Sequence, residues 1–258
     1  MIDTNVSLFR WPYRRLIGDD PEELVTRLRA RGVTQAWAGS FEALLCRDMA
    51  GVNLRLAEAC RQAGSGFLLP FGCVNPKLPD WRDDLRRCHD THRMAGIRLY
   101  PNYHGYDLAD PVFARLLSDA ADRKLIVQIA LSMEDIRTQL TVIPPVDPAP
   151  LADLLPQFPH LRVVLLNHGG WTDDDAGDAI AKIRDSGNAY FDIAMNEGVG
   201  GLERLIAATS SARVVFGSHS PFFYFESASL KVRSAALPSD RERALCQRNA
   251  ESLLDRLS

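Results

Sequence analysis

The segment Phe216-Gly217-Ser218-His219-Ser220-Pro221-Phe222 directly follows two further apolar residues, Val214 and Val215. The apolar run at residues 214–216 predicts a buried β-strand, and the Gly-Ser pair predicts its end. His219 therefore stands at the carboxyl end of that strand. In barrels of alternating strands and helices, side chains that bind or react are found at this end of each strand.

Seven similar apolar runs precede this one, and amphipathic stretches separate them. Such alternation is typical of βα units around a parallel sheet rather than of hairpins. The eight expected strands are residues 1–6, 32–38, 67–74, 96–100, 125–130, 162–166, 189–193 and 212–216. Because an open sheet of that width would leave two edges to protect, we expect a closed (β/α)8 barrel.

Short signals mark where helices between these strands begin. Asp20-Pro21, Asp110-Pro111 and Asp147-Pro148 each offer a side-chain acceptor for the N-cap and a proline for the first turn. The sequence Ser239-Asp240-Arg241-Glu242 predicts a capping box that opens a final helix, which should extend to about Arg256.

Length and charge limit the class of protein. The 258 residues, 46% of them hydrophobic, suffice for one large core, and no linker or low-complexity stretch divides them. We therefore expect residues 1–258 to form a single domain. The net charge of -3 is spread along the sequence and leaves no basic stripe for nucleic acid.

The five cysteines are odd in number and include no C-x-x-C pair, so neither a disulfide framework nor a thiolate zinc site is expected. No apolar stretch approaches the ~20 residues that span a bilayer, and the N-terminus does not have the pattern of a signal peptide. We expect a soluble, cytoplasmic protein that does not associate with membranes. The aromatic run at residues 222–225 is compatible with a homodimer.

Polar residues stand at most of the expected carboxyl ends of the strands. They include Asp3, Asn5, Arg98, Tyr100, Gln128, Asn167, His168, Asp192 and His219. Because these strand ends meet at one mouth of a barrel, we expect the side chains to gather there. Loops are commonly polar as well, so the gathering alone does not define a function.

Five segments resemble the amidohydrolase superfamily, in its branch of metal-dependent hydrolases and decarboxylases. They are Ile2-Asp3, Cys73-Val74-Asn75-Pro76, Gly96-Ile97-Arg98-Leu99-Tyr100-Pro101, Phe216-Gly217-Ser218-His219-Ser220-Pro221 and Arg248-Asn249-Ala250-Glu251-Ser252-Leu253-Leu254. The resemblance implies a barrel that holds one or two divalent metals through D-x-H-x-H on the first strand, histidines on the fifth and sixth, and an aspartate on the eighth. The metal would activate water or polarise the substrate.

The chain departs from this metal-binding pattern on several strands. Asn5 and Ser7 stand where the first strand would carry its two histidines. Gln128 or Ala130 replaces the histidine of the fifth strand, and His219 replaces the aspartate of the eighth. The two-metal centre that the resemblance implies is therefore not expected.

Three possible metal ligands remain, namely Asp3, His168 and His219. Three protein ligands are the usual minimum for a catalytic zinc. Strand alternation argues against the side chains of Asn167 and His168 both pointing inward. We expect a site without metal; one divalent ion, with zinc as the best match, is the alternative.

Without a metal, His219 is the expected general base, because besides His168 it is the only strand-end group that titrates near neutral pH. Asp3 or Asp192 would orient it, and Arg98 would hold a carboxylate or phosphate of the ligand. The remaining pocket residues would be Asn5, Tyr100, Gln128, Asn167 and, on the loop after the fourth strand, His104.

These expectations converge on a hydrolase, or a related decarboxylase or lyase, for a small carboxylated or carbonyl-containing molecule. A catalytically silent barrel that binds a metabolite is the alternative from another class. A phosphate-binding isomerase is a third reading. All three imply a small-molecule partner rather than a nucleic acid or a membrane.

Overall fold

In the computed structural model, eight parallel strands form one sheet whose order follows the chain. The structure describes residues 1–135, 137, 139–169 and 174–255. The strands are β1 (Ile2–Leu8), β2 (Gln35–Ser40), β3 (Leu68–Gly72), β4 (Gly96–Leu99), β5 (Ile126–Ala130), β6 (Arg162–Leu166), β7 (Asn188–Asp192) and β8 (Val214–Val215). Each overlaps one expected strand, and the single-domain (β/α)8 barrel predicted from the sequence is confirmed.

The barrel closes between its first and last strands. The backbone N–H of Thr4 donates to the carbonyl oxygen of Phe216 at 2.9 Å, and that of Ser7 donates to Ser220 at 2.9 Å. Val6 and Ser220 form an isolated parallel bridge. The regular part of β8 is only two residues long, so the segment that follows it completes the contact with β1.

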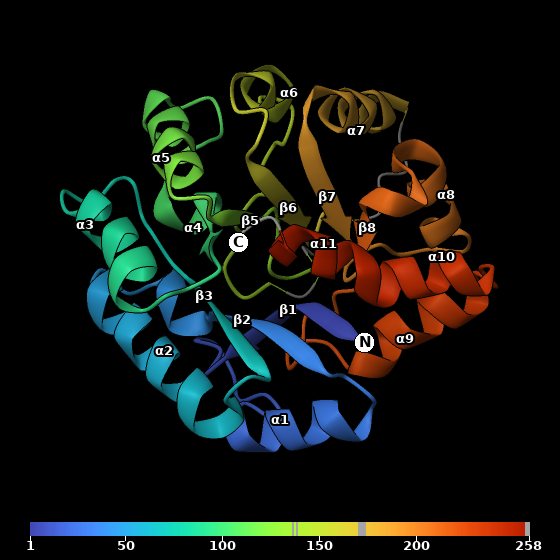
Figure 1. Cartoon of the computed structure of the whole chain (residues 1–258), viewed down its shortest axis with the longest axis horizontal. Coiled ribbons are helices and arrows are strands. Elements are labelled where there is room, and N and C mark those ends of the chain that lie inside the picture. Colours follow the sequence, from blue (N-terminus) through green and yellow to red (C-terminus); the bar gives the residue numbers. More distant parts are fainter. Residues whose placement is uncertain (136, 138, 170–173, 256–258) are drawn as a thin grey trace.

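Helices surround the sheet (Figure 1). They are α1 (Pro21–Ala30), α2 (Met49–Gly64), α3 (Trp81–Arg86), α4 (Pro101–His104), α5 (Pro111–Asp122), α6 (Leu151–Leu154), α7 (Asp174–Ser186), α8 (Gly201–Thr209), α9 (Phe225–Ser234), α10 (Ser239–Arg243) and α11 (Asn249–Asp255). Apolar faces of several of these helices pack against the outside of the strands, as with Leu24 and Leu28 of α1 and Phe113 of α5.

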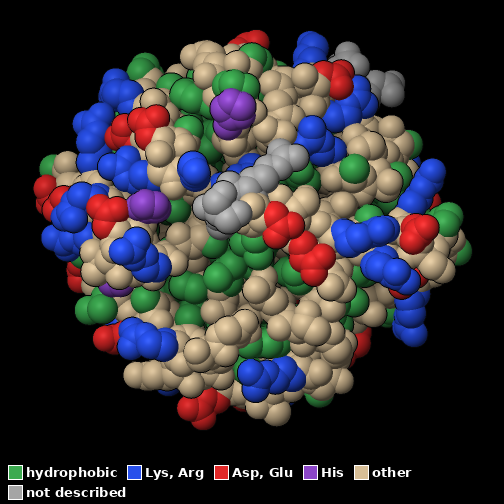
Figure 2. Space-filling model, in the orientation of Figure 1, with side chains coloured by type: hydrophobic (Ala, Val, Ile, Leu, Met, Phe, Trp, Pro, Cys, Tyr) green, Lys and Arg blue, Asp and Glu red, His purple; other side chains and the backbone are tan. Residues whose placement is uncertain are grey.

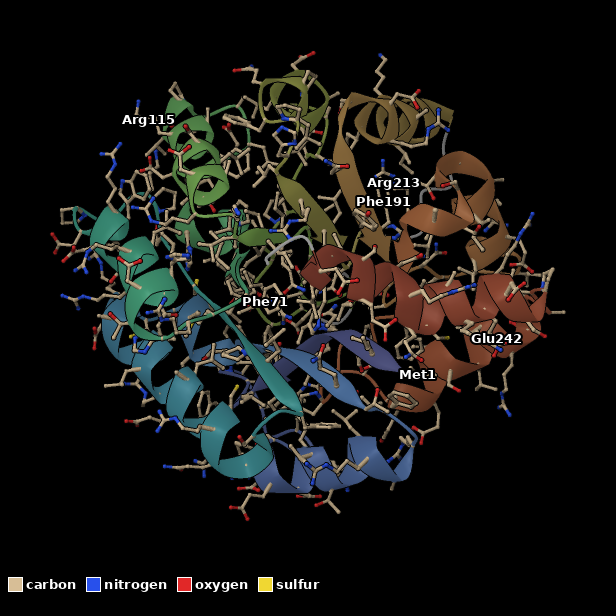
Figure 3. The ribbon with its side chains drawn as sticks, viewed as in Figure 1. Met1, Phe71, Arg115, Phe191, Arg213 and Glu242 are labelled. Carbon is tan, nitrogen blue, oxygen red and sulfur yellow. The ribbon has the colours of Figure 1, made fainter. Side chains whose placement is uncertain are left out.

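Helix α11 lies across the barrel opening that faces the viewer in Figure 1. Its Ala250 and Leu253 pack with Ile2, Trp37 and Phe71 in one buried cluster. Phe71 is labelled near the centre of the barrel in Figure 3. Because Ile2 begins β1, this is the amino-terminal opening, and the carboxyl ends of the strands lie on the far side.

Two of the predicted helix starts are confirmed. The side chain of Asp20 accepts hydrogen bonds from the backbone of Glu22 and Glu23, and Asp110 accepts one from Val112. Each cap also has proline in the first turn, where the missing N–H is not needed.

The other two predicted starts are wrong in position. Asp147 accepts a hydrogen bond from the backbone of Ala149 in a local turn, and α6 begins only at Leu151. Ala149 precedes Pro150, which disfavours helical backbone at Ala149. Ser239 is itself the first helical residue, because the carbonyl oxygen of Pro238 accepts the first helical hydrogen bonds.

The final helix extends close to its predicted end. Helix α10 continues through a π-helical turn, Ala244–Arg248, into α11. The last residue of α11 is Asp255, and the predicted end at Arg256 lies outside the described residues.

The exterior carries charges of both signs. On the face shown in Figure 2, Lys and Arg side chains alternate with Asp and Glu, and no stripe of one sign crosses it. Within the described ranges, no helix combines the length and apolar character that crossing a bilayer requires.

Arg98 of β4 fills the middle of the barrel and is 1% exposed. Its guanidinium donates to the side chain of Gln128 at 2.7 Å and to the carbonyl oxygens of Val6 at 2.8 Å and Trp37 at 3.0 Å. Gly39 of β2 makes room for it, since a Cβ there would lie 2.8 Å from the Cδ and Nη1 atoms of Arg98. Arg98 therefore ties β1, β2 and β5 to β4 from the inside.

We predict that Arg98→Met strongly destabilises the barrel. Methionine fills similar space but leaves several buried oxygens without donors, which should lower the free energy of unfolding by about 3 kcal/mol or more. Chemical denaturation measures this loss. The control is Arg115→Met, on the exposed outer side of α5 (Figure 3), which should change stability by less than about 0.5 kcal/mol. Equal effects of the two substitutions would contradict the role given to Arg98.

Candidate functional site

Asp3 of β1 is the centre of a buried hydrogen-bond network at the carboxyl end of β8. Its Oδ1 accepts hydrogen bonds from the backbone N–H of Ser218 at 3.0 Å and of Asn5 at 3.2 Å. Its Oδ2 lies 2.5 Å from the hydroxyl of Ser218, which in turn lies 2.7 Å from the hydroxyl of Ser220. A carboxyl and two hydroxyls thus form one continuous chain.

A second carboxyl, Asp192 of β7, joins the same network. Its Oδ2 accepts a hydrogen bond from the Asn5 side chain at 2.7 Å, and its Oδ1 accepts one from the backbone of Asn167 at 3.0 Å. The Asn5 amide also donates to the Asn167 side chain at 2.8 Å. The structure therefore brings together Asp3, Asn5, Asn167 and Asp192 as the sequence predicted.

The close approach of these groups requires glycine at position 217. A Cβ there would lie 2.8 Å from Oδ2 of Asp192 and 3.0 Å from the Cβ of Asn5. Contacts this short force neighbouring side chains to move. The Gly-Ser pair that ends the strand run is thus also what lets β7 and β1 share hydrogen bonds beside β8.

Burial raises the pKa values of both carboxyls. Asp3 is fully buried, and desolvation raises its pKa to about 7, against the lowering effect of its hydrogen bonds from Ser218 and Asn5. The negative charge of Asp192 raises it further. Desolvation also raises the pKa of Asp192, opposed by His168 and the hydrogen bond from Asn5. Asp3 can therefore hold a proton near neutral pH.

His219 does not titrate near neutrality, contrary to the role predicted for it as a general base. Its ring is fully buried and stacks on Phe222, with centroids 5.1 Å apart. Desolvation lowers its pKa to about 4. Its Nε2 lies 3.0 Å from the carbonyl oxygen of Met133, and no hydrogen bond joins it to Asp3 or Asp192 among the described residues. At neutral pH, the ring is uncharged and Nε2 donates to Met133.

Asn167 and His168 are both buried, although strand alternation predicted that only one would point inward. Asn167 has a φ of 55°, a left-handed conformation that breaks the alternation at the end of β6. Nε2 of His168 lies 2.7 Å from the backbone oxygen of Asp192, and its ring meets Phe191 edge-on (labelled in Figure 3). Desolvation lowers the pKa of His168.

Arg98 is not the anion clamp that the sequence suggested. Its donors also reach the Ser7 hydroxyl and the Thr4 carbonyl oxygen, so all three guanidinium nitrogens face barrel oxygens. Gln128, predicted to line the pocket, accepts from Arg98 and donates to Thr4 at 2.8 Å. Both side chains therefore build the barrel interior rather than a ligand pocket.

Tyr100 and His104 lie apart from the carboxyl network. The Tyr100 ring belongs to an apolar cluster at the carboxyl ends of the strands that includes Trp11, Phe41 and Phe222. Its buried hydroxyl has no well-formed hydrogen bond to the described residues, and the nearby guanidinium of Arg98 interacts with it electrostatically. The His104 ring packs edge-on to Tyr100, and its Nε2 lies 2.9 Å from the carbonyl oxygen of Ala43.

The side chains at this end of the barrel do not fit a metal ion. Of the predicted ligands, His168 has both ring nitrogens near backbone oxygens, Nδ1 at 3.1 Å from Gly169 and Nε2 at 2.7 Å from Asp192. The Nδ1 atom of His219 is buried and meets no hydrogen-bond partner in the described part of the chain, but one neutral nitrogen is not a metal site. Across the described part of the chain, no group of three or more His, Cys, Asp or Glu side chains could hold a metal. The predicted triad with Asp3 is therefore not assembled.

The sequence did not single out the two serines beside His219. Ser218 and Ser220 connect Asp3 with a cavity of about 790 Å3 that opens beside the end of β8. Ser220, Pro221 and Phe222 form one wall of this cavity, and α1 and residues 14–17 form others. The volume is within the usual range for small-molecule sites. Two serines at i, i+2 around a strand-end histidine were the available signal.

The sequence model of the amidohydrolase family matches residues 8–256. The chain therefore belongs to the amidohydrolase family. At this level the prediction of an enzyme of amidohydrolase type, a hydrolase or related decarboxylase, is confirmed. No curated protein matches the chain in sequence.

Several solved structures share the fold. A dihydroxybenzoic acid decarboxylase from a Polaromonas species, with bound manganese and the inhibitor 2-nitroresorcinol, has a TM-score of 0.74 at 12% identity, covering 98% of this chain and 97% of that chain. A 2,6-dihydroxybenzoate decarboxylase from Rhizobium has 0.72 at 12%, covering 99% and 100%. A probable 2-pyrone-4,6-dicarboxylic acid hydrolase from Acinetobacter baumannii has 0.67 at 14%, covering 98% of each. Identities this low show similarity of fold.

We predict that Asp3→Asn stabilises the protein at neutral pH and less so at acidic pH. A folded-state pKa of about 7, above the ordinary 3.8, means that the unfolded chain loses this proton first as pH rises. The contribution of protonated Asp3 to the free energy of unfolding of the wild type is therefore fully present below about pH 4 and is lost between pH 4 and 7. The loss is roughly 1.4 kcal/mol per unit of pKa shift, a few kcal/mol in total.

Urea unfolding at pH 4.5, 6 and 7.5 measures this difference between variant and wild type. Asp122→Asn, an exposed site at the end of α5, is the control and should show no pH-dependent difference. If the stability difference between Asp3→Asn and the wild type were the same at all three pH values, Asp3 would not be protonated in the folded protein near neutral pH.

Proposed function

We propose that this protein is a metal-independent decarboxylase or hydrolase of small carboxylated molecules, in which Asp3 supplies a proton to the cavity through Ser218 and Ser220. The observation that carries the proposal is the unbroken chain of contacts from Asp3 to Ser218 at 2.5 Å and from Ser218 to Ser220 at 2.7 Å. Ser220 lines the cavity, so the chain ends where a small molecule has space.

The transfer balances as a relay along three oxygens. Asp3 gives its proton to the Ser218 oxygen, Ser218 passes its own proton to Ser220, and the Ser220 hydroxyl proton goes to the substrate. Protonation of the carbon that loses CO2, or of the leaving group in hydrolysis, is general acid catalysis. Asp3 is left as a carboxylate that still accepts the backbone N–H groups of Ser218 and Asn5.

Asp192 supports the acid role of Asp3. The two carboxyls share Asn5 as a neighbour, and repulsion between two buried negative charges favours one proton on the pair. Asp192 accepts hydrogen bonds from the side chain of Asn5 and the backbone of Asn167, and Asp3 is the member of the pair whose pKa is raised to about 7. The positive charge of Arg98 acts on both.

The substrate class has support from the similar structures. Two of them are of enzymes named for carboxylated substrates, 2,6-dihydroxybenzoate and 2-pyrone-4,6-dicarboxylic acid. Metal independence is supported by this chain's own side chains, because both ring nitrogens of His168 lie near backbone oxygens and, among the described residues, no group of three or more His, Cys, Asp or Glu side chains could hold a metal.

The five free cysteines, four of them buried, support a reducing compartment, and we place the protein in the cytoplasm on that basis. A homodimer stays a prediction. Tyr224 is the exposed member of the aromatic run that suggested it.

A panel of aromatic carboxylates and lactones, assayed before and after dialysis against EDTA, tests the proposed function. We expect turnover that survives chelation and that falls as pH rises above about 7, because the acid form of Asp3 is then lost. Asp3→Asn should lower kcat by roughly 100-fold or more. Asp122→Asn should leave kcat unchanged.

Two results would overturn parts of this proposal. Activity that requires about one equivalent of a divalent metal would refute metal independence. A folded, metal-free protein without turnover on the whole panel would favour the catalytically silent metabolite binder.

A further inference from the structure

We propose that the cavity beside β8 is a binding site for a small aromatic carboxylate, with Arg14 as the residue that holds its negative charge. The inference deepens the proposed function, on which it rests for the idea that the bound molecule is the substrate. The binding itself can be tested without any turnover.

Arg14 lies at the edge of the cavity with its charge available. Its guanidinium carbon lies 5.2 Å from the centroid of the Phe222 ring. Among the described residues, it forms no ion pair with a carboxylate. Its charge acts at longer range on Glu134, whose pKa burial raises and Arg14 lowers. An incoming carboxylate can therefore bind Arg14 without displacing an internal partner.

The other arginines around the cavity already have acidic partners. Arg31 pairs with Glu226 at 2.6 Å, and Arg15 pairs with Asp19 at 2.7 Å. Arg27 and Arg137 pair with Glu23 and Asp135. Arg14 is the remaining arginine of the cavity, and it has no such pair with any described residue. The site therefore suits a ligand with a single negative charge. A dianion would leave one charge uncompensated or break an existing pair.

The walls of the cavity suit an aromatic or other flat apolar body. Phe222 and Phe223 lie with ring centroids 5.4 Å apart, and Tyr224 beside them is 73% exposed. Buried Leu24 and Leu28 of α1 contribute aliphatic surface. Ring stacking and burial of apolar surface would hold the body of the ligand while Arg14 holds its carboxylate.

The position of the cavity connects it with the buried network. Phe222, which meets Arg14, also stacks on His219. Ser220, two residues before it, lines the cavity and contacts Ser218. A ligand anchored at Arg14 therefore lies against the same wall as the last hydroxyl of the chain that begins at Asp3.

Calorimetric titration with benzoate tests the site, with benzyl alcohol as the neutral probe. We expect wild-type protein to bind benzoate with a Kd on the order of 1 mM or below and to bind benzyl alcohol at least tenfold more weakly. Arg14→Gln should weaken benzoate binding roughly tenfold or more, the usual effect of losing a charge-assisted hydrogen bond. Arg14→Lys should restore part of the affinity.

Arg10→Gln is the matched control, because Arg10 is exposed in the same segment and is not among the residues that line the cavity. It should bind benzoate as the wild type does. Equal affinity of wild type and Arg14→Gln would overturn the inference, as would an absence of benzoate binding at tens of millimolar.

Asp3→Asn separates this inference from the proposed function. It should keep benzoate affinity within about twofold, since Asp3 does not line the cavity. Arg14-dependent binding without turnover on any substrate would refute the proposed function and leave the site standing. Turnover together with benzoate binding that does not depend on Arg14 would refute the binding site and leave the proposed function standing.

Discussion

The buried guanidinium of Arg98 is the interaction on which the rest of this structure depends. It replaces part of an apolar barrel core with a cation whose donors face oxygens of β1, β2 and β5. Its charge also lies close enough to favour the ionised forms of Asp3 and Asp192. Burial still raises the pKa values of both carboxyls, so this positive charge offsets only part of the cost of burying them.

The polar side chains inside this barrel bond to one another and to the backbone, so they are not free to bind a ligand as they would be at an open active site. Asn5, Asn167 and Gln128 use their amides to join strands, and an apolar cluster with Trp11 and Phe41 packs at the same end of the barrel. The groups that remain able to meet a ligand lie at the edge, in the segment after β8 and the segment after β1. In this chain the fold of the family is kept, whereas the ligand recognition that we propose depends on residues outside the strand-end positions that the family pattern emphasises.

The sequence predicted the barrel because its signals are local: apolar strand runs and aspartate-proline helix starts need only neighbouring residues. It also predicted that Asp3, Asn5, Asn167 and Asp192 would meet, since parallel strands bring their carboxyl ends together. The partners of Arg98 could not be predicted, because an arginine can bind either an external anion or internal carbonyl oxygens. The absence of a side chain at Gly39 leaves the space in which Arg98 lies inside the barrel and reaches the internal carbonyl oxygens. His219 was misjudged because its partner, Met133, lies 86 residues away in the chain.

Ser220 takes part both in the closure of the barrel and in the wall of the cavity. Its carbonyl oxygen accepts the hydrogen bond from Ser7 that closes the barrel, and the residue also lines the cavity. The contact between β1 and the segment after β8 is called the seam here. Ligand binding in the cavity and opening of this seam are therefore linked equilibria. A molecule that binds only the closed arrangement stabilises the seam in proportion to its concentration, so the Ser7 amide would exchange its hydrogen more slowly when the ligand is present.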